Sequence, residues 1–111
     1  MFTNKKYIIE NIDSVSIIIV HYGDIKYLKG CLTSIFKNTS CPEIPVEVVI
    51  VSNKSLISPG EIKDIPISFK WNIEVIHSTK NLGYAGSINL GLKHSTGSVI
   101  VILNNDYVIF F

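Results

Sequence analysis

The chain has 111 residues, of which 47% are hydrophobic and 17% charged, and its formal net charge at pH 7 is +1. This length suffices for one domain with a hydrophobic core and is too short for two, and the composition excludes an intrinsically disordered chain. A net charge this close to zero gives no electrostatic surface for nucleic acid or for an anionic membrane.

The sequence shows neither a membrane span nor a secretory signal. No apolar run reaches the roughly 20 residues of a transmembrane helix, and residues 1–13 contain no signal-peptide core. We therefore expect a cytoplasmic protein with an N-terminal extension at residues 1–13 and a domain at residues 14–111. The cysteines, Cys31 and Cys41, have no partners at metal-binding spacing, which argues against a zinc site or a disulfide.

The first predicted unit is a strand followed by a helix. The β-branched run at residues 15–20 lacks strict alternation, which is typical of a strand buried on both faces of a parallel sheet. Asp24 is a suitable helix N-cap. The residues that then recur at helical spacing are Ile25, Leu28, Cys31, Leu32, Ile35 and Phe36. The helix should end near residues 38–40, before Pro42.

Three more strands and one more long helix are predicted downstream. Residues 46–51 form an apolar strand, residues 57–69 a loop with at most a short helix, and residues 72–76 a weaker strand. A helix at 84–94 stops at 95–97, and the apolar run at 98–103 predicts a buried fourth strand. This alternation predicts an α/β fold, a Rossmann-like three-layer sandwich with a mainly parallel sheet.

Parallel strands place their carboxyl ends along one edge of the sheet, where open α/β sheets bind ligands. The polar residues predicted to share that edge are His21, Tyr22, Gly23, Ser52, Asn53, His77, Ser78, Asn104, Asn105 and Asp106. Oxygen ligands from Asp106 and Asn104 suit Mg²⁺ or Mn²⁺, with water and phosphate in the remaining positions.

Several common uses of such an edge are excluded. The first strand is not followed by Gly-x-Gly-x-x-Gly, and no Gly-Lys-Ser/Thr phosphate loop is present. Neither Gly-x-Ser-x-Gly nor a Cys–His pair at a strand end offers an acyl-transfer nucleophile. A response-regulator-like domain needs an acidic cluster after the first strand, and only Asp24 lies nearby.

Four segments in this order resemble family 2 glycosyltransferases of the GT-A fold, especially their rhamnosyltransferase-like members. They are His21-Tyr22, the polar end of the second strand, NLGYAG at residues 81–86 and LNND at residues 103–106. The resemblance spans residues 15–111. It implies the nucleotide-binding half of an enzyme that transfers a sugar, with inversion, from a UDP- or dTDP-sugar to an acceptor hydroxyl. The divalent cation would be Mg²⁺ or Mn²⁺, acting on the departing diphosphate.

The resemblance also implies roles for individual residues. Tyr22 would line the nucleotide base, and Asp106 would coordinate the metal. The residues implied to bind the nucleotide sugar are His21, Tyr22, Gly23, Ser52, Asn53, Asn81, Gly83, Ala85, Asn104 and Asn105. Asn53 and Ser55 match the polar loop after the second strand, and Gly86 follows Ala85 at the start of the helix.

The chain also departs from the family pattern. Ser52 replaces the Asp that commonly reads the base, Asn104 replaces the first Asp of the metal motif, and Ser87 and Ile88 replace a frequent Gly and Asn. The acceptor-side catalytic base belongs to a C-terminal half that follows in the family, so we expect no catalytic residue in this chain and no activity of the chain alone.

Other interpretations of these residues remain open. The chain could be a degenerate, non-catalytic nucleotide-binding or interaction module. Asp106 could be a turn residue, and Gly83 and Gly86 could serve the helix start alone. The apolar residues 107–111 predict an exposed C-terminal strand through which the chain would form a homo-oligomer, or a chain cut from a longer enzyme.

Overall fold

The computed structural model describes residues 13–38, 44–53, 57–63, 65, 71–78 and 80–105. The elements within them are β1 (Val15–His21), α1 (Ile25–Asn38), β2 (Val46–Asn53), α2 (Pro59–Ile62), β3 (Trp71–Ser78), α3 (Gly83–His94) and β4 (Val99–Asn104). The four strands predicted between residues 15 and 103 and both predicted long helices are present. The main differences are that β2 and β3 continue to Asn53 and Ser78, beyond the predicted ends at residues 51 and 76.

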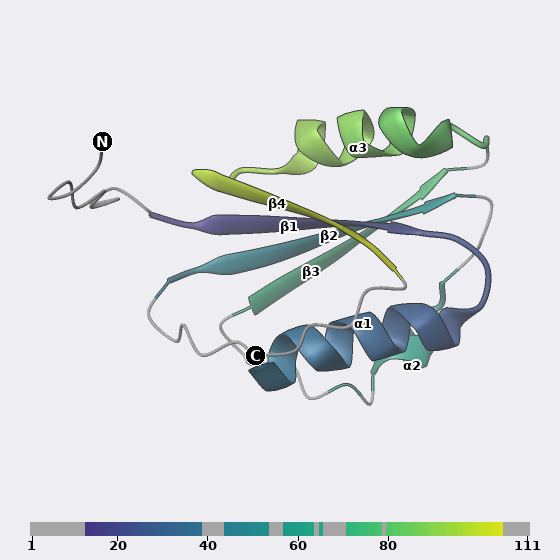
Figure 1. The fold of residues 1–111 in the computed structure, drawn as a ribbon, viewed down its shortest axis with the longest axis horizontal. Coiled ribbons are helices and arrows are strands. Elements are labelled where there is room, and N and C mark those ends of the chain that lie inside the picture. The colour runs from purple at the N-terminus through teal and green to yellow at the C-terminus, as the bar shows by residue number, and fades with distance from the viewer. Residues whose placement is uncertain are drawn as a thin grey trace, which may run out of the picture.

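The four strands form one parallel sheet in the order β3-β2-β1-β4. Helix α3 covers one face of this sheet, and α1 and α2 lie on the other face (Figure 1). The prediction of a three-layer α/β sandwich with a parallel sheet is therefore confirmed. In the register of the sheet, His21 pairs with Ser52 and Ser52 with His77, while Val20 pairs with Asn104. The strands thus present their carboxyl ends at one edge, as predicted.

The larger hydrophobic core lies between the sheet and α1. Helix α1 begins where the Asp24 carboxylate accepts a 2.9 Å hydrogen bond from the Lys26 N–H, as expected of an N-cap. The buried residues of this core are Ile17, Ile19, Leu28, Cys31, Leu32, Ile35, Val46, Val48, Ile50, Ile57, Ile65 and Trp71. Each large apolar side chain buried here contributes about 1.5–3 kcal/mol to stability, so α1 is the principal cover of the sheet.

The core beneath α3 is much smaller. Only Ile18, Val49 and Val51 are its buried hydrophobic members among the described residues, with Ile76 and Leu90 packed against them. The helix lies very close to the sheet here, since a Cβ added at Gly91 would be 2.7 Å from Ile18 Cγ2. The small residues of α3 therefore let the helix approach the sheet closely, and few large apolar side chains lie between them.

Strand β4 is an edge strand of the described sheet, and it is more exposed than its apolar sequence predicts. It pairs with β1, while α3 packs over β1 and β2. Ile100, Val101 and Ile102 are consequently 37%, 37% and 41% exposed. The prediction of a buried fourth strand was wrong, because the apolar character of a run does not specify its position in the sheet. The expected C-terminal strand at 107–111 lies outside the described residues.

Hydrogen bonds to Glu47 connect the amino-terminal edge of the sheet to the α3–β4 connection. Its Oε2 accepts hydrogen bonds from the Thr96 N–H at 2.6 Å, from the Thr96 hydroxyl at 3.0 Å and from the Ser16 hydroxyl. The Ser16 hydroxyl oxygen in turn accepts a 2.7 Å bond from the Gly97 N–H. Glu47 therefore links β2, β1 and the segment that leads into β4.

Membrane insertion through a helix finds no support in the described residues. None of the helices in this part of the chain combines the length and the apolar character that crossing a bilayer requires.

Candidate functional site

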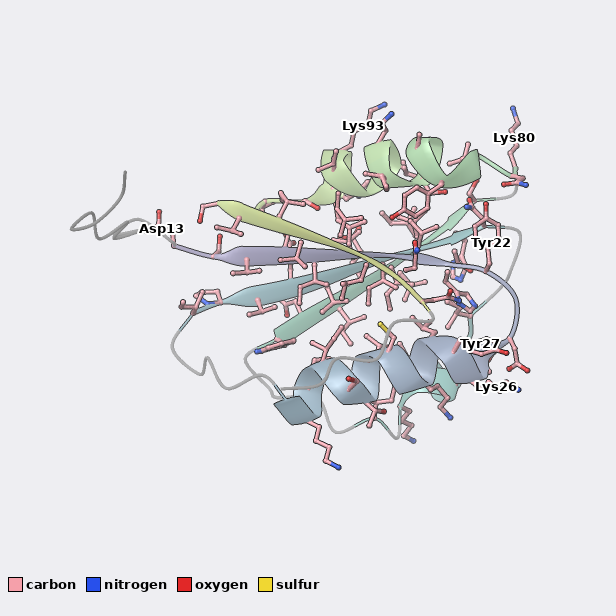
Figure 2. The ribbon with its side chains drawn as sticks, in the orientation of Figure 1. Asp13, Tyr22, Lys26, Tyr27, Lys80 and Lys93 are labelled. Atoms are coloured by element: carbon pink, nitrogen blue, oxygen red, sulfur yellow. The ribbon has the colours of Figure 1, made fainter. Side chains whose placement is uncertain are left out.

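A pocket of about 470 Å³ opens at the carboxyl edge of the sheet, where β1 and β4 end. The described residues that line it are Val20, Tyr22, Tyr27, Tyr84, Asn104 and Asn105. The three tyrosines come from the β1–α1 loop, α1 and α3, and are 41%, 50% and 46% exposed. Figure 2 shows Tyr22 and Tyr27 together at one end of the molecule, opposite Asp13. The pocket thus has aromatic walls and a polar wall formed by two carboxamides.

Tyr22 is held in place by the turn that begins α3. The Asn81 side-chain oxygen accepts hydrogen bonds from the Tyr22 hydroxyl at 3.1 Å and from the Gly83 N–H at 3.0 Å. Gly83 has a positive φ of 69°, and Gly23 has a φ of 70°. Both values lie in the left-handed region that glycine adopts without a steric penalty. The loop after β1 and the start of α3 therefore meet through a defined polar contact.

The buried side-chain amide of Asn53, at the end of β2, is connected to the same turn through Ser87. The Asn53 side-chain N–H donates to the Ser87 hydroxyl oxygen, and that hydroxyl donates to the Gly83 carbonyl at 2.7 Å. Asn53 is 1% exposed, and its Oδ1 is a buried acceptor without a hydrogen-bond partner among the described residues. A continuous polar path therefore runs from the end of β2 through α3 to Tyr22.

Asn105 joins the end of β4 to the end of β1. Its Nδ2 donates to the Tyr22 carbonyl at 2.8 Å and lies 2.9 Å from His21 Nδ1. Because the amide donates, Nδ1 is an acceptor, which places the proton of a neutral imidazole on Nε2. Burial lowers the pKa of His21 below its ordinary 6.5, although the carboxylates of Glu61 and Asp24 act to raise it. His21 is therefore a neutral, structural partner of Asn105 at neutral pH.

The structure brings part of the predicted residue set to the pocket. Tyr22, Asn104 and Asn105 line it directly. The predicted residues joined to these or to the supporting turn by hydrogen bonds are His21, Asn53, Asn81 and Gly83. Gly23 is exposed beside Tyr22.

Four residues singled out in the sequence do not line the pocket or lie outside the described residues. Ser52 is fully buried, and Ala85 is exposed on α3 and is not among the pocket-lining residues. Asp106, the predicted metal ligand, lies outside the described residues, as does Ser55.

Sequence reasoning missed two of the aromatic walls. Tyr27 falls outside the apolar spacing of α1, and Tyr84 precedes the buried positions of α3. Each is an aromatic residue on a helix position that does not face the core, within one turn of a strand end of the kind that binds ligands. This combination is the signal that could have identified both.

The chain belongs to the glycosyltransferase family 2. The family profile described as Glycosyl transferase family 2 matches residues 16–110. The glycosyltransferase GlyG of Streptococcus pneumoniae serotype 4 is 27% identical over 95 residues, which are 86% of this chain and 31% of GlyG. The chain therefore spans about a third of the length of this relative.

Solved structures show the same fold. S. aureus TarS, residues 1–349, superposes with a TM-score of 0.68 at 26% identity, over 86% of this chain and 28% of that one. The mannosyltransferase PcManGT of Pyrobaculum calidifontis gives a TM-score of 0.69 at 23% identity, over 85% and 28% of the two chains. These similarities confirm the GT-A fold and the predicted family.

Proposed function

We propose that residues 14–111 form the donor-binding part of a glycosyltransferase, which holds a nucleotide-diphospho-sugar at the carboxyl edge of the sheet. The observation that carries this proposal is the pocket between Tyr22, Tyr84 and the Asn104–Asn105 turn, in a chain of this family. Its volume lies within the range of about 300–1,000 Å³ that is usual for small-molecule sites. Tyr22 supplies an aromatic face for a base or sugar, and the carboxamides supply hydrogen bonds.

Two structural relatives support a nucleotide ligand. TarS has been solved in complex with UDP, and that structure matches this chain at 26% identity with a TM-score of 0.65. PcManGT has been solved with GDP-Man and Mn²⁺. The UDP complex favours a UDP-sugar as the donor that we propose for this chain, and the resemblance to rhamnosyltransferase-like enzymes adds a dTDP-sugar as the alternative.

The chemistry of residues 104–106 would suit a divalent cation that is shared with the ligand. The described residues include no group of three or more His, Cys, Asp or Glu side chains that could hold a metal ion. Asn104 and Asn105 offer neutral oxygen atoms, and Asp106 is the only acidic residue that follows Glu74 in the sequence. Mg²⁺ is usually held by one or two carboxylates together with water and substrate phosphates. When bound, the ion would neutralise charge on the departing diphosphate.

Transfer of the sugar to an acceptor is proposed for the whole enzyme and not for residues 14–111 alone. No carboxylate is among the described residues that line the pocket, so none is placed there to deprotonate an acceptor hydroxyl. The chain also corresponds to only 28–31% of the relatives given above. We expect donor binding without sugar transfer.

Calorimetric titration of the chain with UDP and with dTDP, each with and without Mn²⁺, tests this proposal. We expect saturable binding that requires Mn²⁺, and no binding of Mn²⁺ alone, because the protein supplies too few charged ligands. Asp106→Ala should weaken the binding at least tenfold, which is about 1.4 kcal/mol. Asp13→Ala, a carboxylate at the opposite end of the molecule, is the matched control and should leave the affinity unchanged.

Two outcomes contradict the proposal. Absence of binding for both nucleotides at millimolar concentration would leave a degenerate module without a donor site. Binding that is equally strong without metal and in Asp106→Ala would remove the metal from the proposal while retaining the nucleotide.

A further inference from the structure

We propose that Ser87 is a positioning residue for the nucleotide site: it holds the first turn of α3, and through that turn it fixes the position of the Tyr22 ring. This inference rests on the proposed function, in which Tyr22 forms one wall of the ligand pocket. Ser87 is fully buried and does not line the pocket itself, so it acts on ligand affinity through Tyr22. This role is the same whether the base or the sugar contacts the Tyr22 ring.

The link between the two side chains runs through both backbone groups of Gly83. The Gly83 carbonyl accepts a 2.7 Å hydrogen bond from the Ser87 hydroxyl, which lies about one helical turn further along α3. The Gly83 N–H donates a 3.0 Å hydrogen bond to the side-chain oxygen of Asn81, and the same oxygen accepts a 3.1 Å bond from the Tyr22 hydroxyl. These hydrogen bonds connect the buried face of α3 to the exposed ring of Tyr22.

The first turn of α3 depends on these bonds because its N-cap residue cannot supply one. The N-cap residue is Leu82, which has no polar side chain with which to bind the free N–H groups of the turn. The next residue, Gly83, has a φ of 69° and no side chain to restrict its conformation. The bonds from Asn81 and Ser87 therefore hold a residue that would otherwise change its backbone angles easily.

Asn53 orients the Ser87 hydroxyl for this link. The Asn53 Nδ2 donates to Ser87 Oγ, so the proton of that hydroxyl is directed to the Gly83 carbonyl. Asn53 is buried and does not line the pocket, and we assign its effect on ligand binding to Ser87. The alternative is direct contact with the ligand through Asn53 Oδ1, which has no hydrogen-bond partner among the described residues.

The test is a double-mutant cycle in the affinity for UDP, measured by calorimetry with Mn²⁺ at a temperature at which each variant is folded. Ser87→Ala and Tyr22→Phe should each weaken binding about fivefold, because the ligand must then order a side chain that the wild type orders in advance. The double variant should also lose only about fivefold, since both changes break the same link. If dTDP is the nucleotide that binds, it replaces UDP.

Ser95→Ala is the matched control for Ser87→Ala. It removes a similar 2.7 Å bond from a side-chain hydroxyl to a helix carbonyl, that of Gly91, at the other end of α3. The affinity for UDP should therefore stay unchanged in Ser95→Ala. Equal weakening in Ser95→Ala and Ser87→Ala would show a general effect of destabilising α3, and it overturns the inference.

A second cycle, which combines Asn53→Ala with Ser87→Ala, separates the two roles of Asn53. We expect Asn53→Ala to weaken UDP binding in the wild-type background and to have no further effect in the Ser87→Ala background. Equal weakening in both backgrounds would show that Asn53 contacts the ligand directly, which overturns its assignment to Ser87. If Ser87→Ala does not fold, Asn53→Ala takes its place in the cycle with Tyr22→Phe, and the same non-additivity is expected.

The outcomes also separate this inference from the function on which it rests. Absence of binding of UDP and of dTDP to the wild type removes both. Wild-type binding that is unchanged in Ser87→Ala overturns the inference alone, because Ser87 would then serve only the stability of the fold. Effects of Ser87→Ala and Tyr22→Phe that combine to about 25-fold also overturn it, because the Tyr22 hydroxyl would then act independently of Ser87.

Discussion

Glu47 couples the stability of the fold to pH through its hydrogen bonds at the amino-terminal edge of the sheet. Burial by itself would raise its pKa, but the hydrogen bonds from Ser16 and Thr96 outweigh this effect and lower the pKa below the ordinary 4.5. A carboxyl group with a lowered pKa in the folded state stabilises the fold above its unfolded pKa. That contribution is lost as the pH falls below about 4.5 and through the folded pKa.

Replacing Glu47 by glutamine tests this contribution. Glu47→Gln keeps the shape and one acceptor but removes the charge, so we expect it to unfold about 1 kcal/mol more easily at pH 7. The difference from the wild type should shrink as the pH falls through the folded pKa of Glu47, because the wild-type carboxyl then also loses its charge. Urea unfolding at a series of pH values from 7 downward measures the effect. Glu74→Gln, an exposed partner of His94, is the control, and a difference that is independent of pH would contradict the prediction.

Ser87 is a second residue whose role can be isolated. Ser87→Ala leaves the buried Asn53 amide without the Ser87 hydroxyl as its acceptor, and we expect a loss of about 1–3 kcal/mol in the free energy of unfolding. Ser95→Ala, which removes a similar 2.7 Å bond to the Gly91 carbonyl at the other end of α3, should cost about 0.5 kcal/mol.

Combining Ser87→Ala with Asn53→Ala checks the cause. The double variant should be less destabilised than the sum of the two single variants, because it no longer contains the unpaired amide. Strict additivity in urea unfolding would show that the Asn53–Ser87 bond contributes nothing.

Helix α3 depends on a glycine at its contact with the sheet. Gly91→Ala places a methyl group 2.7 Å from Ile18 Cγ2, so the helix or the strand must shift, at a cost of about 1–3 kcal/mol. Gly30 lies inside α1 with nothing within 4 Å of an added Cβ. Gly30→Ala should therefore stabilise the protein by about 0.5–1 kcal/mol through helix propensity. Thermal unfolding of both variants measures the contrast, and equal effects would contradict the close approach of α3.

Strand β4 exposes an apolar edge without the charges that usually protect edge strands. We expect this edge to bind the same edge of a second copy, since antiparallel pairing of an edge strand with itself is compatible with two-fold symmetry. Ile102→Lys should shift the chain toward monomer in sedimentation velocity, while Lys93→Glu, on exposed α3, should not. A wild type that remains monomeric at about 100 μM would show that this edge does not associate by itself.

The order and type of the elements could be predicted because each depends on local pattern. β-Branched runs such as residues 15–20 and the cap at Asp24 act over a few residues. The exposure of β4 could not be predicted in this way, since it depends on which strand lies at the edge. Likewise, Tyr22 was predicted as a site residue from its position after a strand. Tyr27 and Tyr84 line the same pocket because α1 and α3 lie on opposite faces of one sheet, which local sequence does not specify.

The whole molecule is asymmetric in its two helical layers. Helix α1 buries Leu28, Cys31, Leu32 and Ile35, whereas the buried residues of α3 are Ser87 and Gly91. Segments with little buried apolar surface open locally at lower free energy. We therefore expect amides of residues 83–94 to exchange hydrogen faster than those of residues 25–38, as measured by mass spectrometry. Equal protection would show that the sheet and both layers open as one unit.

The position of Trp71 gives this protein an internal optical reporter. It is the only tryptophan of the chain, it packs edge-on against Phe36 with ring centres 4.8 Å apart, and it pairs with Val46 at the amino-terminal edge of the sheet. The proposed ligand lies at the carboxyl edge and cannot quench this indole by contact. A change in tryptophan emission when nucleotide is added would therefore report a rearrangement transmitted through the sheet, and constant emission would indicate a rigid scaffold.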